Sequence, residues 1–272
     1  MKKPEIANMI KTGDFMTNYH DQGEGFPVIL IHGSGPGVSA WANWRLVIPK
    51  LAPSRRVIAP DMVGFGYTDR PEGIEYTWKV WVKQVIDLMD ALGIEKTDLV
   101  GNSFGGAMAL TLAIEYPERI RRVVLMGAMG VDFPITDGLD SVWGYEPSVE
   151  NMKRMLELFV YNKNIATEDL AKMRYEASIE PGFQESFSAM FPAPRQQWVD
   201  FMARTEEEIK SVKQPTLIVH GREDAVIPVE NSYKLFNLID NAQLHVFGHC
   251  GHWTQIEQTD KFTQLVDNFL GE

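Results

Sequence analysis

The stretch TDLVGNSFGG, residues 97–106, places Ser103 between glycines, directly after a strand-like run and before a long apolar segment. A strand that turns sharply into a helix through the pattern G-x-S-x-G exposes the serine hydroxyl, and Gly101, Gly105 and Gly106 supply the room for that turn. A serine in this position can act as a nucleophile. The same short pattern also fits a strand-to-helix turn without chemistry, so the rest of the chain has to decide.

Length and composition limit the possible classes of protein. A chain of 272 residues suits one α/β domain with an insertion. The formal net charge of −11 argues against a nucleic-acid-binding or anionic membrane surface, and an anionic substrate would need local positive charge. No apolar run is long enough to span a bilayer, so we expect a soluble protein. The single cysteine, Cys250, excludes an intrachain disulfide and favours the cytoplasm.

Short apolar runs alternate with helical patterns along most of the chain. The runs are typical of parallel strands covered on both faces, and their alternation with helices predicts a βαβ sheet. An antiparallel pair around residues 15–25 is expected to precede them. The predicted strands are residues 26–32, 55–61, 97–102, 121–127, 215–221 and 242–248, and the predicted helices include 76–93, 105–120 and 254–270.

The alternation stops between about Phe133 and Val212, where helical and aromatic-rich segments follow one another. We interpret this region as an inserted helical cap. The predicted division is therefore a core in two parts, residues 1–133 and 213–272, with the cap at residues 134–212. Its methionines and aromatic residues fit ordinary core packing, but a cap over the carboxyl edge of a sheet would also form the wall of a pocket.

A nucleophilic Ser103 needs a histidine base, and in α/β hydrolases this histidine follows the acid in the chain. His20 and His32 precede the serine, while His220 and His245 belong to predicted strands. His249 and His252 remain, in the loop before the last helix. We choose His252 because it follows Gly251 and leads directly into that helix. A metal pair formed by His249 and His252 lacks a third ligand of matching spacing.

The acid is expected in the loop after the penultimate strand, where HGREDAVIP, residues 220–228, offers Glu223 and Asp224. We choose Asp224. Asp132, after the sixth strand, is the second candidate. Cys250 is interpreted as a small buried residue because no strand-to-helix turn surrounds it.

An oxyanion hole requires backbone N–H groups directed at the developing charge. The turn itself supplies the N–H of Phe104, and the glycine-rich loop HGSGPG, residues 32–37, is expected to supply that of Ser34. This loop could also suggest phosphate binding, but no lysine follows in the required pattern. The serine, acid and histidine in this order predict an α/β-hydrolase fold, with a mostly parallel eight-stranded sheet.

Several longer segments resemble the meta-cleavage product hydrolases, which cut ring-fission products of catechols. The resemblance extends over nearly the whole chain, and the cap is most similar to the branch acting on single-ring and alkyl-substituted products. Haloalkane dehalogenases and epoxide hydrolases carry aspartate where Ser103 stands. The similar segments are HGSGPGVSAWANW, RRVIAPDMVGFGYTDRP, GNSFGG, SVWGYEPS, RYEASIEPGFQESFSAMFPAPRQ, HGREDAVIP and LHVFGHCGHWTQIE.

The resemblance implies a substrate of the 2-hydroxy-6-oxohexa-2,4-dienoate type, hydrolysed between C5 and C6, and no cofactor. It also implies substrate-binding roles for Asn43, Asn102, Arg174 and Trp253; without it, these would be interpreted as an ordinary surface arginine, loop asparagines and a core tryptophan. Homo-oligomers are common in this family. Two competing functions are a carboxylesterase, which would not need Arg174 and the asparagines, and a non-catalytic binding protein.

The C6 substituent of such a substrate is expected to point away from Arg174, toward the loops after the sixth and seventh strands and the cap. Met129 would make this distal pocket small, or else simply fill the core. The residues proposed for the distal pocket are Met129, Leu139, Trp143, Val226 and Ile227.

Overall fold

The structure is a computed structural model that describes residues 3–272. One sheet of eight strands, in the order β1-β2-β4-β3-β5-β6-β7-β8, forms its centre. Strands β3 to β8 are parallel, whereas β2 pairs antiparallel with both β1 and β4. The prediction of a mostly parallel eight-stranded sheet is therefore confirmed. The strands are β1 (Asn8–Thr12), β2 (Phe15–Gln22), β3 (Pro27–Ile31), β4 (Arg56–Pro60), β5 (Thr97–Asn102), β6 (Ile120–Met126), β7 (Thr216–Gly221) and β8 (Ala242–Phe247).

The antiparallel pair at the start of the chain lies earlier than predicted. Asn8 pairs with Tyr19 and Thr12 with Phe15, so the hairpin begins before residue 15. Gly13, in the tight turn, has a φ of 57°, which glycine adopts without strain. Strand β1 lies at the edge of the sheet and is mostly exposed, so it lacks the apolar run that marks the inner strands.

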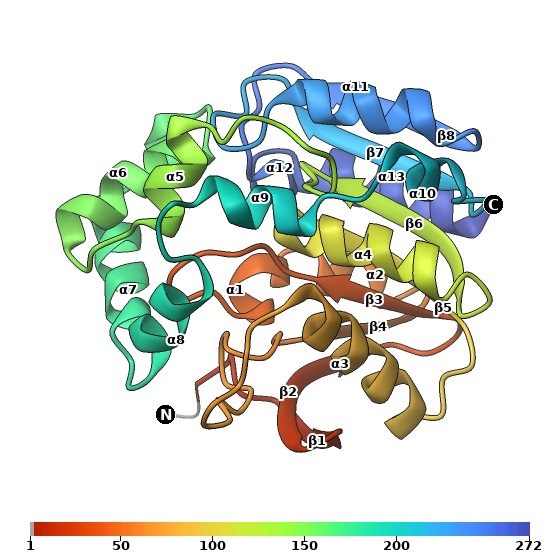
Figure 1. Ribbon diagram of the computed structural model, residues 1–272, viewed down its shortest axis with the longest axis horizontal. Helices are drawn as coiled ribbons and strands as arrows, with labels where there is room; N and C mark the ends of the chain where they lie inside the picture. Colours follow the sequence, from red (N-terminus) through yellow and green to blue (C-terminus); the bar gives the residue numbers. More distant parts are fainter. Residues whose placement is uncertain (1–2) are drawn as a thin grey trace.

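Helices cover both faces of the sheet (Figure 1). Residues such as Trp81 and Leu110 contribute to the apolar core on one face, whereas Trp44, Leu51 and Phe262 contribute to the core on the other. Burial on both faces explains why the inner strands are almost continuously apolar. The helices outside the β6–β7 connection are α1 (Ala40–Trp44), α2 (Ile48–Leu51), α3 (Trp78–Ala91), α4 (Phe104–Glu115), α11 (Val229–Leu238), α12 (Thr254–Glu257) and α13 (Thr259–Gly271).

Two predicted helices end or divide differently in the structure. Helix α4 stops at Glu115, before the predicted residue 120, because Pro117 disfavours helical backbone at the residue before it and cannot donate an N–H. The helix predicted for residues 254–270 is divided at Gln258 into α12 and α13. The short α12 thereby forms a separate turn next to the loop that contains His252.

The chain between β6 and β7, all of which the structure describes, contains helices and no strand. We call this segment the cap; its helices α5 to α8 gather beyond one end of the sheet, at the left of Figure 1. The exact domain division stays a prediction. The cap helices are α5 (Asp137–Trp143), α6 (Val149–Phe159), the 3-10 helix η1 (Lys163–Ile165), α7 (Glu168–Ser178), α8 (Phe183–Met190), α9 (Gln196–Met202) and α10 (Glu206–Lys210).

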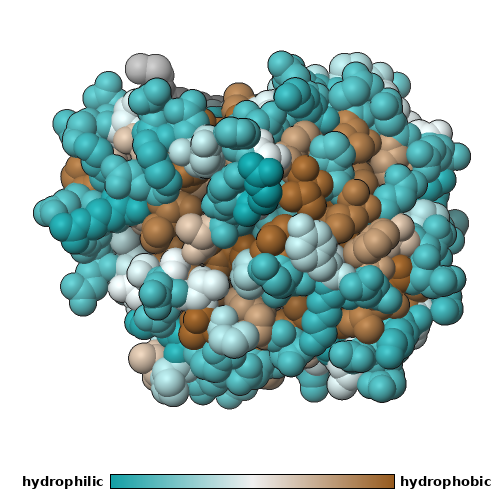
Figure 2. All heavy atoms as spheres, turned by 90° about the horizontal axis from the view of Figure 1, so that it is seen from above, coloured by the Kyte–Doolittle hydropathy of each residue, from teal (hydrophilic) through white to brown (hydrophobic). Residues whose placement is uncertain are grey.

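The surface seen from above Figure 1 is largely hydrophilic, with a broken band of hydrophobic side chains across its middle (Figure 2). Within residues 3–272, none of the helices is both long enough and apolar enough to cross a membrane.

Candidate active site

Ser103 occupies the sharp turn between β5 and α4. Its backbone has a φ of 55° and a ψ of −114°, a conformation that residues with a side chain rarely adopt. A Cβ atom on Gly101 would lie 2.2 Å from the carbonyl oxygen of Gly105, and a Cβ atom on Gly105 would lie 2.2 Å from that of Ile31. Close backbone contact therefore requires glycine on both sides of the serine.

Asp224 and His252 form a hydrogen-bonded pair. Nδ1 of His252 lies 2.7 Å from Oδ2 of Asp224, while Oδ1 accepts the backbone N–H groups of Val226 and Ile227 at 2.8 and 2.9 Å. Burial opposes the charge on Asp224, but His252 and hydrogen bonds from His252 and His220 outweigh it and hold the pKa of Asp224 well below its ordinary value. The ionised carboxylate favours the tautomer in which Nδ1 carries the proton and Nε2 can accept one.

The serine and the histidine are brought to the same edge of the sheet, since both follow the carboxyl ends of parallel strands. Within residues 3–272, the hydrogen bonds of His252 reach Asp224 but not the hydroxyl of Ser103. Catalytic hydrogen bonds are often long until substrate is bound. The pairing of nucleophile and base thus stays a proposal.

His220 is a further contact of Asp224 that the sequence did not suggest. Its Nε2 lies 3.3 Å from Oδ2 of Asp224 and 3.0 Å from the carbonyl oxygen of Ile227, and its Nδ1 lies 2.6 Å from the hydroxyl of Ser232. The side chain is fully buried. The sequence could have indicated this contact, because His220 lies at the end of β7 and only four residues before Asp224, so that both residues belong to one turn.

Asp132 and His249, the second candidates for the acid and the base, make contacts elsewhere. The carboxylate of Asp132 is paired with Lys234, and this hydrogen bond lowers the pKa of Asp132. His249 is exposed, and its Nδ1 lies 3.0 Å from the hydroxyl of Tyr161. Neither residue therefore contacts the Asp224 and His252 pair.

Glu223 and Cys250 contact each other and are not part of the Asp224 and His252 pair. Glu223 accepts the backbone N–H of Cys250 at 3.0 Å and pairs with Arg222 at 2.7 Å. Burial raises the pKa of the Cys250 thiol to about 12, which disfavours a nucleophilic thiolate. No group of three His, Cys, Asp or Glu side chains within residues 3–272 could hold a metal ion.

The loop after β3 lies beside the start of α4 because β3 and β5 are neighbours in the sheet. In this loop, the hydroxyl of Ser34 accepts the indole N–H of Trp143 at 3.0 Å. Phe104, the first residue of α4, is buried, with its ring 4.7 Å from that of Trp81. The assignment of the Ser34 and Phe104 N–H groups to an oxyanion hole stays a proposal.

His32 fixes the beginning of the same loop. Its Nδ1 lies 2.8 Å from the carbonyl oxygen of Gly33, and its Nε2 accepts the N–H of Met62 at 2.9 Å. These contacts suit the neutral ring with its proton on Nδ1. Burial lowers the pKa of His32 to about 4.

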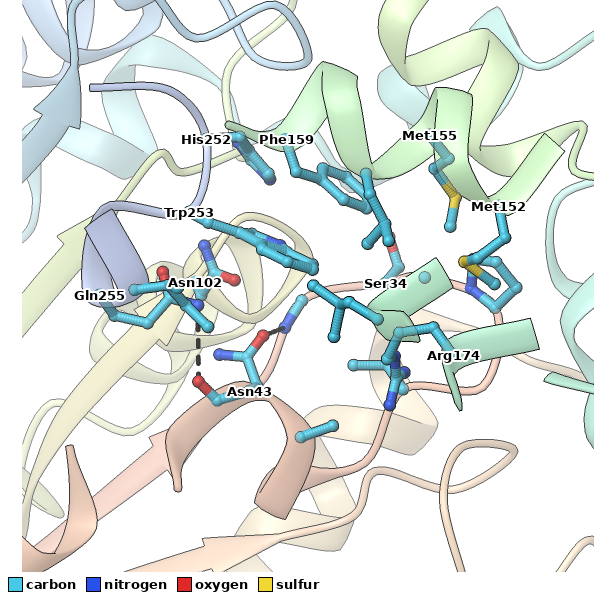
Figure 3. Close-up of a pocket in the computed structure, with 18 of the residues that line it drawn as sticks. Ser34, Asn43, Asn102, Met152, Met155, Phe159, Arg174, His252, Trp253 and Gln255 are labelled. Carbon is cyan, nitrogen blue, oxygen red and sulfur yellow. Dashed lines mark hydrogen bonds between the residues drawn. The ribbon is translucent and has the colours of Figure 1, made fainter. Parts of the chain in front are cut away.

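A cavity lies between this loop, helix α1, the His252 loop and cap helices α6 and α7 (Figure 3). Arg174 and His252 lie on opposite sides of it. All four predicted substrate-binding residues contribute to its wall. The lining residues are Gly33, Ser34, Gly35, Pro36, Val38, Ala42, Asn43, Arg45, Asn102, Met152, Met155, Leu156, Phe159, Leu170, Arg174, His252, Trp253, Gln255 and Ile256.

The polar wall of the cavity carries positive charge and an unused donor. Arg174 donates to the carbonyl oxygen of Gly37 at 2.7 Å, and burial together with the charge of Arg45 lowers the pKa of Arg174 to about 10. The side-chain nitrogen of Asn43 is buried and has no hydrogen-bond partner within residues 3–272. Asn102 donates to the carbonyl oxygen of Met126 at 3.4 Å. Such a wall can bind an anion that also accepts hydrogen bonds.

Several lining residues were missed by sequence reasoning. Arg45 is only two residues after Asn43, so the substrate-binding role proposed for Asn43 could have indicated that Arg45 also lies near the substrate. Residues Met152, Met155, Leu156 and Phe159 have the spacing of one apolar helix face, which a buried core produces equally well.

The five residues proposed for the distal pocket are buried but do not line this cavity. Met129 nevertheless adjoins the nucleophile, since its N–H donates to the carbonyl oxygen of Ser103 at 3.1 Å. Val226 and Ile227 adjoin Asp224 through their backbone N–H groups. The distal pocket stays a prediction.

Comparison with known proteins gives strong matches over the whole chain. The α/β hydrolase fold family model matches residues 27–259. The 2-hydroxymuconate semialdehyde hydrolase of Pseudomonas sp. (strain CF600) is 59% identical over 269 residues, covering 99% of this chain and 95% of that protein. The 2-hydroxy-6-oxo-2,4-heptadienoate hydrolase of Pseudomonas putida (strain F1) is 57% identical, covering 98% and 96%.

A solved structure is equally similar. The meta-cleavage product hydrolase from Pseudomonas fluorescens IP01, in a serine-to-alanine variant complexed with acetates, has a TM-score of 0.98 and 59% identity, covering 99% of both chains.

Proposed function

Because the chain belongs to the α/β hydrolase fold family and, within it, to the meta-cleavage product hydrolases, we propose that Ser103, Asp224 and His252 carry out its carbon–carbon bond hydrolysis. The substrate is a ring-fission product of the 2-hydroxy-6-oxohexa-2,4-dienoate type. Water cleaves the bond between C5 and C6 and gives 2-hydroxypenta-2,4-dienoate and a carboxylic acid.

The chemistry requires a proton transfer before the bond breaks. When the C5–C6 bond breaks, C5 leaves with the electron pair of that bond. The dienol must therefore first become a keto form, because its C2 carbonyl can accept this electron pair. His252 moves this proton in the proposed mechanism. The same imidazole is held by Asp224, whose depressed pKa keeps the carboxylate charged during the transfer.

Ser103 then attacks the C6 carbonyl while its hydroxyl proton passes to Nε2 of His252, and the N–H groups of Ser34 and Phe104 stabilise the oxyanion. Collapse of this intermediate breaks the C5–C6 bond, and the electron pair passes to the dienolate. Water activated by His252 then releases the carboxylic acid from Ser103. The sequence of steps balances without any cofactor.

The carboxylate and the C2 oxygen are bound by Arg174, Asn43, Asn102 and Trp253 in this proposal. The observation that carries it is the half-buried Arg174, which lies across the cavity from His252 and lines the cavity together with Asn43, whose amide nitrogen has no hydrogen-bond partner within residues 3–272. Arg45 adds a second guanidinium to this wall. A neutral ester would use neither cation, which disfavours an ordinary carboxylesterase.

A steady-state comparison tests the proposed function. Purified protein is given dienoates with hydrogen, methyl, isopropyl or phenyl at C6, and a neutral aryl ester, while loss of the yellow dienolate absorbance or release of the phenol is followed. We expect the kcat/KM of at least one dienoate to be higher than that of the aryl ester. A preference for the ester would instead favour a carboxylesterase.

The cellular location and assembly are proposed from the sequence alone. We infer a cytoplasmic enzyme because its single cysteine cannot form an intrachain disulfide. The homo-oligomer is likewise a proposal, tested by the mass of the protein in solution.

A further inference from the structure

Glu257, the last residue of α12, joins two parts of the chain through its carboxylate. Its Oε2 accepts the backbone N–H of Gly251 at 2.6 Å and that of Tyr161 at 3.0 Å. Its Oε1 accepts the N–H of Asn162 at 2.8 Å. Gly251 directly precedes His252, whereas Tyr161 and Asn162 follow the end of cap helix α6, whose last residue, Phe159, lines the cavity. One side chain therefore satisfies N–H groups on both the core and the cap.

Other contacts hold the same two segments together. The N–H of Trp253 donates to the carbonyl oxygen of Phe159 at 2.9 Å. A Cβ atom on Gly251 would lie 2.8 Å from that same oxygen and 2.9 Å from the nitrogen of Tyr161, so the backbones approach too closely for any other residue. We call this contact between residues 159–162 and residues 250–253 the cap junction.

The cap junction places a cavity wall against the proposed base. The ring of Phe159 stacks on Trp253 with centroids 4.9 Å apart and lies 5.8 Å from the ring of His252. All three residues line the cavity. A shift of residues 159–162 relative to residues 250–253 would therefore change where a substrate lies relative to His252.

We propose that Glu257 is a positioning residue for catalysis, which fixes the His252 loop and the end of α6 in one arrangement. This inference rests on the proposed role of His252. Three backbone N–H groups around a carboxylate form charge-assisted hydrogen bonds, so Glu257 restrains the loop more strongly than a neutral contact would. A misplacement of about 1 Å between base and substrate can reduce a rate about 10²-fold.

The first experiment separates chemistry from binding. Glu257→Ala is compared with Asp260→Asn, which removes a nearby exposed carboxylate paired with Lys50 but leaves the cap junction intact. We expect Glu257→Ala to lower the single-turnover rate of dienoate decay about 10- to 100-fold at equal folded concentration. In a Ser103→Ala background, its dienoate dissociation constant should change less than about threefold, because the acid end is bound by Arg174 on α7.

A second experiment uses the cap side of the junction and remains informative if Glu257→Ala fails to fold. Asn162 has a φ of −78°, which proline can adopt, so Asn162→Pro removes the N–H that Asn162 donates to Glu257 while keeping this angle. Asn162→Ala is the control for the lost side chain. We expect Asn162→Pro to lower the single-turnover rate about 3- to 10-fold below Asn162→Ala, and to have little further effect in Glu257→Ala.

Equal rates for the proline and alanine variants would overturn the inference. A Glu257→Ala protein that unfolds at lower temperature but keeps its single-turnover rate would do so as well, since Glu257 would then only stabilise the fold. Either result, combined with an inactive Ser103→Ala enzyme, would leave the proposed function standing. Normal dienoate turnover by Ser103→Ala alone would instead contradict the proposed function.

Discussion

The indole nitrogen of Trp143, in cap helix α5, lies 3.0 Å from the hydroxyl oxygen of Ser34, in the loop after β3. Both residues were selected from the sequence, one for the distal pocket and one for the oxyanion hole, but their contact was not predicted. The Trp143 ring also stacks on Phe191, with centroids 4.4 Å apart. A cap residue thus helps to hold the loop that is proposed to stabilise the oxyanion.

Trp143→Phe should retain an aromatic ring and lose the N–H donor to Ser34. One hydrogen bond contributes about 0.5–1.5 kcal/mol, so we expect kcat/KM for the dienoate to fall about 2- to 12-fold. Trp198→Phe is the matched control, because its indole N–H donates to the carbonyl oxygen of Pro192 away from the cavity. Equal losses in both variants would argue against a role of the Ser34 contact in catalysis.

Ser103→Ala should reduce turnover of the dienoate by at least about 10³-fold, since the attacking oxygen is removed. Binding should persist because Arg174 and Asn43 line the cavity, whereas Ser103 does not contribute to its wall. Stopped-flow absorbance measures the turnover, and a spectral titration measures the binding. Near-normal turnover in the purified variant would end the assignment of Ser103 as nucleophile.

Arg174→Gln should lower kcat/KM for the dienoate about 10- to 150-fold, the equivalent of about 1.5–3 kcal/mol for a hydrogen bond to a charged group. Hydrolysis of a neutral aryl ester should change much less. Arg154→Gln is a suitable control, because Arg154 is exposed and, within residues 3–272, forms an ion pair only with Glu150 on the same helix. Equal losses on ester and dienoate would indicate that Arg174 maintains packing instead.

Met129→Ala should raise kcat/KM for the isopropyl or phenyl dienoate relative to the methyl compound. Met129 is fully buried and its N–H donates to Ser103, so removing its side chain would enlarge space near the nucleophile. A difference of one or two methylenes is worth about 1–3 kcal/mol, and the preference should therefore be graded. An unchanged ratio in a folded variant would remove Met129 from the distal pocket.

His32 should make the protein less stable as the pH falls. Its pKa is about 4 in the folded chain and 6.5 ordinarily, so the unfolded chain takes up the proton first. Its contribution is complete above about pH 6.5 and is lost as the pH falls toward 4, a loss of about 3 kcal/mol. Urea unfolding at several pH values measures this loss.

His32→Gln should unfold with a correspondingly shallower pH dependence, because glutamine does not titrate. His245→Gln, a change at an exposed position in β8, should keep the slope of the original protein. The same slope in all three proteins would show that His32 is not responsible.

The fold and the site could be predicted from the sequence where a local structural requirement allows only one type of residue. The glycines around Ser103 are required by backbone contacts of 2.2 Å, and the apolar runs of the inner strands follow from burial on both faces. The edge strand β1 was located too late because it is mostly exposed and carries no such run. The early end of α4 could have been inferred from Pro117 alone.

Contacts between distant segments could not be predicted in the same way. Phe159 has the helical spacing of a core residue, and only the packing of α6 against the His252 loop makes it part of the cavity wall. The three N–H groups bound by Glu257 belong to backbone, which carries no residue-specific signal. The contact between His220 and Asp224 differs, because the two residues are only four positions apart and their spacing could have indicated it.

The backbone conformation of Ser103, with its φ of 55°, positions the proposed nucleophile for catalysis but lowers the thermal stability of the protein. A residue with a side chain held in this conformation costs on the order of 1–3 kcal/mol, whereas glycine adopts it readily. Ser103→Gly is therefore expected to melt at a higher temperature than the active enzyme while losing its turnover. Repeated selection for heat resistance, without selection for growth on the substrate, would tend to discard the nucleophile itself.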